Sequence, residues 1–119
     1  MNRYLLALAT AAGLLIGGMG AAMAQYGTND GQNRWMTVNN HTNSATAINI
    51  YIITSGANCC WSQDLLGSNV VSAGRSFNVN FDNGSRACVF DIRITSETRG
   101  RDWVFNAVDV CRESALNLR

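Results

Sequence analysis

The chain has 119 residues, of which 47% are hydrophobic and 14% are charged, with nine basic and eight acidic side chains. A near-neutral balance without a basic stripe excludes the usual nucleic-acid and anionic-membrane binders, and the length suits one small domain. One histidine, no phosphate-binding glycine loop and no cluster of metal-ligand spacing are present. We therefore expect no cofactor, no metal and no nucleic-acid partner.

The first 24 residues have the pattern of a secretory signal peptide. Arg3 supplies the positive start, an apolar run extends from Leu5 to about Ile16, and a small-residue A-x-A site precedes Gln25. The run is short for a membrane span and is interrupted by glycines. We therefore expect export to the periplasm or the medium, cleavage after residue 24, and no membrane span afterwards.

Residues 25–33 are polar and turn-rich, which predicts a flexible lead, and residues 34–119 alternate as strands do in a single β domain. Strands are expected at residues 34–39, 45–54, 75–81 and 86–95, from Trp103 to Cys111, and over the closing residues 113–119. Residues 60–67 lack strand character, and a single helical turn ended by Gly67 is expected there. The fold class that follows is all-β: a small antiparallel β-sandwich of six to seven strands, with a small closed β-barrel as the alternative.

Two turn signals set a predicted register for the second half of the chain. If Asn83 and Gly84 form a two-residue hairpin turn, the numbers of any two residues that face each other across that hairpin add up to 167. A second turn at Arg99 and Gly100 makes the facing pairs of the next hairpin add up to 199. The two hairpins together predict a three-stranded meander that places Asp109 on its core face, opposite Phe90. The remaining core-facing residues are Phe77, Val79, Phe81, Cys88, Ile92, Ile94, Trp103, Phe105 and Ala107.

Four cysteines in an exported chain predict disulfide support. The register above places Cys88 opposite Cys111, which predicts a bridge between them, and a β-bulge would make that bridge diagonal. Cys59 and Cys60 then remain. They join each other, pair with another chain, or stay free.

Several short motifs resemble a family of small exported bacterial proteins of uncharacterised function. Its W-x-x-D-L-L-G loop is similar to residues 61–67, its Cys-x-aromatic-Asp run to residues 88–91, and its closing V-[DN]-x-C to residues 108–111. The resemblance covers residues 35–111 and implies that Cys88 and Cys111 are the shared pair. The adjacent Cys59 and Cys60 depart from the family pattern, and no catalytic residue is carried over.

Two classes of function compete for this sequence. The favoured class is a non-enzymatic module of the periplasm or cell envelope that binds an envelope protein or a small ligand through a candidate loop containing Trp61, Asp64 and Leu65. The alternative is a small thiol-disulfide protein that uses Cys59 and Cys60, which lack the C-x-x-C spacing of known redox motifs. Asp64 is expected to cap the local turn. No catalytic residue is predicted.

Overall fold

A computed structural model describes residues 29–98 and 100–119 of the chain. The expected signal peptide, the first residues of the lead (25–28) and Arg99 lie outside the described residues. The described chain belongs to two compact units. Gln32–Phe81 and Ala87–Arg119 form the larger unit, which holds every strand, whereas Asp82–Arg86 belongs to the other unit.

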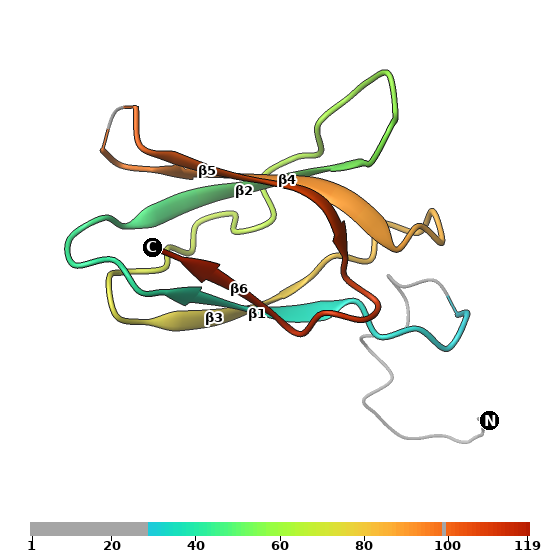
Figure 1. Ribbon diagram of the computed structural model, residues 1–119, viewed down its shortest axis with the longest axis horizontal. Coiled ribbons are helices and arrows are strands. Elements are labelled where there is room, and N and C mark those ends of the chain that lie inside the picture. Colours follow the sequence, from blue (N-terminus) through green and yellow to red (C-terminus); the bar gives the residue numbers. More distant parts are fainter. Residues whose placement is uncertain (1–28, 99) are drawn as a thin grey trace. The chain divides into compact units, whose positions relative to one another are not determined.

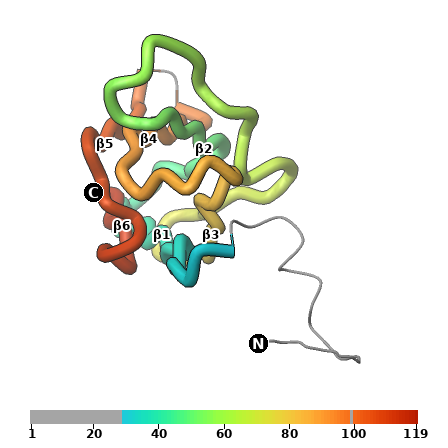
Figure 2. The backbone as a smooth tube through the Cα atoms, turned by 90° about the vertical axis from the view of Figure 1, so that its right-hand side faces the viewer, coloured from blue at the N-terminus to red at the C-terminus, as the bar shows by residue number. Residues whose placement is uncertain are grey.

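The described residues form six strands and no helix, which confirms the all-β class. In chain order these are β1 (Trp35–Asn40), β2 (Ala47–Thr54), β3 (Ser76–Asn80), β4 (Val89–Ser96), β5 (Asp102–Asp109) and β6 (Ala115–Leu118). They make two three-stranded sheets in the orders β3-β1-β6 and β2-β4-β5, which form two layers (Figures 1 and 2). Because neither sheet closes, the domain is a sandwich and not a closed barrel. No apolar helix of membrane-spanning length occurs among the described residues.

The core lies between the inner faces of the two sheets. Alternation along each strand sends every second side chain inward, so Met36 and Val38 of β1 face the other sheet, as do Ile50 and Ile52 of β2. Ile48 has the same parity as these isoleucines along β2, but it is only half-buried because a register irregularity lies between Ala47 and Asn49. The other core residues are Ala47, Leu66, Val71, Val79, Phe81, Phe90, Ile92, Ile94, Val110, Leu116 and Leu118.

The predicted pairing of β3 with β4 is wrong. β3 pairs antiparallel with β1, so that Val79 lies opposite Met36, and β6 adds to the other side of β1 in parallel. The three-stranded meander is therefore absent, since β3 and β4 belong to different sheets. The alternation correctly sorted core-facing from polar side chains, but an inward-facing strand can belong to either layer of a sandwich.

The structure of the segment Asp82–Arg86 explains why Asn83 and Gly84 do not form the predicted hairpin turn. The side chain of Asp82 accepts the N–H of Gly84 at 2.9 Å, and that of Asn83 accepts the N–H of Ser85 at 3.1 Å. These are Asx turns, which Asn and Asp make as readily as hairpin turns. Gly84 has a φ of +83°, and Arg86 also has a positive φ of 66°. The segment forms a local turn of its own and does not join neighbouring strands.

The β4–β5 hairpin is confirmed with a register two residues away from the predicted one. Ile94 lies opposite Trp103 and Ile92 opposite Phe105, because the two strands pair about a centre one residue earlier in the chain than the predicted turn. The shift is an even number, so these side chains keep their predicted face. A bulge between Phe90 and Ile92 then changes the register again.

The expectation that Ala107 faces the core is wrong because of this bulge. Ala107 is exposed, with a φ of 55°, and its N–H donates to Asp91 Oδ1 at 2.9 Å. The bulge also shifts the residues beyond it, so that Asp109 lies opposite Val89 and not opposite Phe90.

Candidate functional site

The chain that follows β2 leaves the sheet and then returns along its outer edge. Residues 55–61 rise away from β2, drawn in green in Figure 1. The N–H of Ser62 then donates to the carbonyl of Ile52, and the N–H of Leu65 donates to that of Ile50, both at 2.8 Å. Ser62 Oγ accepts the N–H of Ile52 at 3.0 Å. The returning segment therefore covers the edge of β2, in the way that sandwiches protect open edges.

No helical turn forms over residues 60–67, contrary to expectation. Backbone groups of this segment bond to β2 and not to one another, which removes the hydrogen bonds that a helical turn needs. Leu66 is buried in the core, and Leu65 is partly buried against it. Leu65, named as a candidate for partner binding, therefore contributes mainly to packing.

Asp64 fixes this loop in place. Its Oδ1 accepts the N–H of Leu66 at 2.9 Å, which is the expected local cap. The same oxygen accepts the N–H of Ile50 at 2.9 Å, and Oδ2 accepts the side-chain amide of Asn49 at 2.9 Å. Because both carboxylate oxygens are engaged, Asp64 is a structural anchor for the loop.

Trp61 precedes the anchored segment and stays 45% exposed. It lines a hollow of about 330 Å³ on the outer face of the β2-β4-β5 sheet, together with Tyr51, Ser62, Arg93 and Thr95. Two aromatic rings, a guanidinium and three hydroxyls therefore surround one shallow space. Such a combination of flat apolar surface and a few polar groups is typical of small-molecule and peptide recognition.

The polar wall of the hollow is fixed by hydrogen bonds to its neighbours. The Arg93 guanidinium forms an ion pair with Asp102 at 3.0 Å. Thr95 Oγ1 donates to Asn49 Oδ1 at 2.6 Å, and the Asn49 amide donates to Asp64. The bonds through Asn49 thus connect Thr95, in the wall of the hollow, to Asp64, the anchor of the Trp61 loop.

The cysteines pair as Cys88 with Cys111 and Cys59 with Cys60. The first bridge confirms the prediction, with a Cα–Cα distance of 5.4 Å. It is diagonal, because the N–H of Val110 donates to the carbonyl of Cys88 and the bulge has shifted the register. Cys59 and Cys60 are exposed in the loop just before Trp61, and of the three alternatives for them the structure has the mutual bond.

One group of potential metal ligands forms among the described residues: Cys88, Asp109 and Cys111 lie within 4.8 Å of one another. Both sulfurs belong to the disulfide, so neither is available as the thiolate that metals bind. Asp109 Oδ1 accepts the N–H of Cys111 at 3.1 Å. Asp109 thus caps the turn that carries Cys111 at the end of β5.

Sequence reasoning missed a buried arginine. Arg34 is only 2% exposed; its Nε donates to the carbonyl of Ala87 at 2.8 Å, and its Nη2 lies 3.8 Å from the sulfur of Cys88. The available signal was parity, since Arg34 is in phase with the inward-facing Met36 and Val38. His41, by contrast, is exposed and contacts Asn117 Oδ1 at 3.2 Å.

Comparison with protein-family models, with curated proteins and with solved structures gives no match to this chain.

Proposed function

We propose that the protein is a small exported binding module of the periplasm or cell envelope, and that the hollow beside Trp61 is its binding surface. The observation that carries this proposal is an exposed indole on a loop that Asp64 and Ser62 fix to β2. A loop that is already attached to the sheet loses little conformational entropy when it contacts a ligand, and an aromatic side chain is a common anchor at binding surfaces. The ligand is a small molecule or a segment of an envelope protein.

Substitution of Trp61 tests this surface. Mature protein carrying Trp61→Ala should fold normally and lose crosslinked capture of envelope components that the unsubstituted protein captures. Trp35→Ala is the matched control, because Trp35 is 42% exposed at the start of β1 and does not line the hollow. Equal capture by the two variants would show that the hollow is not the binding surface.

The second candidate function is thiol-disulfide exchange, and one observation favours it: the Cys59–Cys60 pair is exposed in the loop next to Trp61. An insulin-reduction assay on the purified mature protein separates the two functions. A binding module gives no turnover, whereas turnover that disappears in Cys59→Ser and Cys60→Ser would replace the binding proposal with the redox one. Binding remains preferred because hydrogen bonds connect Asp64 through Asn49 to Thr95 in the hollow, and Ser62 separately attaches the loop to β2.

Export is part of the same proposal, supported by the pattern of the first 24 residues. The mature chain should begin at or near Gln25, and intact-mass measurement of material from the periplasm or medium checks it. Retention of residues 1–24 in that material contradicts export with cleavage. The resemblance to small exported bacterial proteins agrees with this location.

A further inference from the structure

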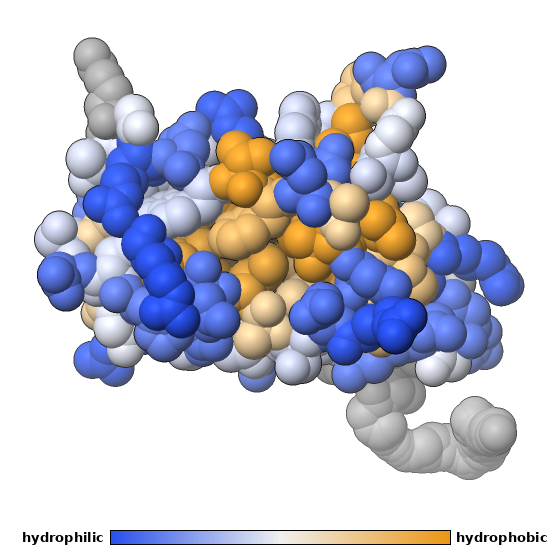
Figure 3. All heavy atoms as spheres, in the orientation of Figure 1, coloured by the Kyte–Doolittle hydropathy of each residue, from blue (hydrophilic) through white to orange (hydrophobic). Residues whose placement is uncertain are grey.

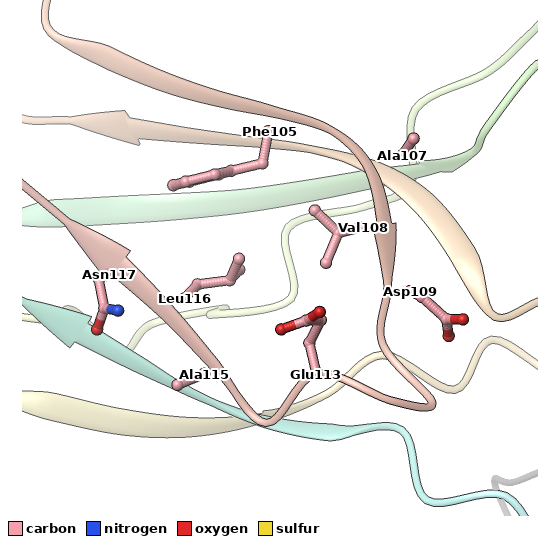
Figure 4. Close-up of a pocket in the computed structure, with 8 residues that line it drawn as sticks. All are labelled: Phe105, Ala107, Val108, Asp109, Glu113, Ala115, Leu116 and Asn117. Carbon is pink, nitrogen blue, oxygen red and sulfur yellow. The ribbon is translucent and has the colours of Figure 1, made fainter.

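A second hollow lies on the side of the sandwich where the two sheets end in β5 and β6. It forms a groove of about 440 Å³ between these edge strands, with apolar surface along its length (Figures 3 and 4). Phe105 and Val108 of β5 and Leu116 of β6 point into it (Figure 4). The groove shares no lining residue with the hollow beside Trp61.

The backbone of β5 is open along this groove. In an antiparallel pair, alternate residues direct their N–H and C=O groups toward the partner strand. The carbonyl of Cys88 accepts a hydrogen bond from Val110, next to β5, and the carbonyl of Val89 accepts one from Ser55, next to β2. The backbone groups of even-numbered residues of β4 therefore point toward β5, and those of odd-numbered residues point toward β2. This phase continues along β4 as far as Ile94.

The same phase determines which groups of β5 stay open. Phe105 and Trp103, opposite Ile92 and Ile94, bond to β4, and the intervening Val104 directs its backbone groups outward. By the same alternation, the backbone groups of Asn106 also point outward, up to the bulge. Among the described residues, none is found to bond to the outward groups of Val104. β2, the other edge of the same sheet, is covered by residues 62–65, so β5 is the edge that can accept a strand.

Negative charge at one end of the groove favours an added strand that carries a positive side chain at that end. The Glu113 carboxylate points into the groove (Figure 4), and among the described residues no partner is found for it. Asp109 lies at the same end, and its Oδ1 accepts the N–H of Cys111. At the opposite end, Trp103 Nε1 donates to the carbonyl of Arg119 at 3.2 Å, which links β5 to the end of β6.

We propose that the β5 edge accepts an extended segment of a partner protein as an added antiparallel or parallel strand. Its alternate apolar side chains cover Phe105 and Leu116, and a lysine or arginine at the end nearest Glu113 pairs with that carboxylate. Main-chain hydrogen bonds to Val104 supply affinity, while the apolar groove and the carboxylate supply specificity, as in other cases of strand addition. This site is independent of the function proposed for the Trp61 hollow.

A display library of random linear hexapeptides, screened against the exported chain, is the direct test. Enriched peptides should alternate apolar and polar residues and carry a terminal lysine or arginine. A synthetic enriched peptide should bind Glu113→Lys at least about tenfold more weakly, since an opposite charge is replaced by a like charge. Glu97→Lys makes the same change of charge at an exposed residue that does not line the groove, and it should bind normally.

Two further measurements separate strand addition from other modes of binding. N-methylation of every second peptide nitrogen should abolish binding when the methylated nitrogens are those that point toward β5, and should leave binding intact when they point away. Bound peptide should also slow hydrogen exchange at the backbone N–H of Val104. No enrichment, or binding that depends on Trp61 and not on Glu113, overturns the proposal. A dimer in sedimentation analysis that protects Val104 without peptide also overturns it, because a second copy then occupies the edge.

Discussion

The carboxylate of Asp64 accepts the backbone N–H of Ile50 at 2.9 Å across a separation of 14 residues. This contact attaches the loop after β2 to the edge of the sheet from which it came. The loop therefore both protects that edge and presents Trp61 above the neighbouring hollow. Stability and presentation of the candidate surface depend on the same side chain.

Replacement of Asp64 by alanine should lower the free energy of unfolding by about 2–3 kcal/mol, because three hydrogen bonds to a carboxylate are lost. Urea denaturation measures the change, and hydrogen exchange at Ile50 should become faster. Asp102→Ala, which removes only the exposed ion pair with Arg93, should cost less than about 1 kcal/mol. Equal effects of the two substitutions would contradict the anchoring role of Asp64.

The two disulfides should differ in their contribution to stability. Cys88 and Cys111 are 23 positions apart, so replacing both by serine releases a long loop in the unfolded chain and should cost about 2–5 kcal/mol. Cys59 and Cys60 are adjacent, and the same double replacement should cost clearly less. Denaturation of the two double-serine variants makes the comparison. Non-reducing peptide mapping that links Cys59 or Cys60 to Cys88 would show the pairing to be wrong.

The buried Arg34 should be important for stability although its sequence context is unremarkable. Arg34→Ala removes the donor to the carbonyl of Ala87 and leaves a cavity, and should lower the free energy of unfolding by about 3 kcal/mol. The matched control is Arg75→Ala, at an exposed position, with an expected change within about 0.5 kcal/mol. A thermal or urea unfolding curve for Arg34→Ala that overlaps that of Arg75→Ala would rule this role out.

Glu97 should make stability depend on pH in acid. The N–H of Thr46 donates to Glu97 Oε1 at 2.8 Å and holds the pKa of Glu97 below its usual value. The contribution is therefore fully present above the unfolded-state pKa of about 4.3 and is lost as pH falls through the lower folded-state pKa. Thermal unfolding midpoints of the unsubstituted chain and Glu97→Gln should converge as pH falls below about 4. If the difference between the two unfolding midpoints instead widened in acid, the hydrogen bond from Thr46 to Glu97 would not be stabilising the folded chain.

Local patterns in the sequence determined which side chains are inside. Alternation predicted the buried positions Phe90, Ile92 and Ile94 of β4. The pairing of Cys88 with Cys111 followed from a hairpin register that was itself two residues off. An even error preserves the face of the side chains between the turn and the bulge, and the bulge between Phe90 and Ile92 brought Cys111 to a diagonal position beside Cys88. The all-β class and the last strand, β6, also followed from alternation.

Only the tertiary structure decided which strands are neighbours. The sequence near Asn83 carries a hairpin signal, yet β3 pairs with β1, which is about forty residues earlier in the chain, and β6 pairs with β1 in parallel. The burial of Arg34, the long-range contact from Asp64 to Ile50 and the open edge at Val104 arise from those pairings. Periodicity reports the environment of each residue within its own strand, whereas neighbours across a sheet are selected by the packing of both layers around one core, which no local window of sequence contains.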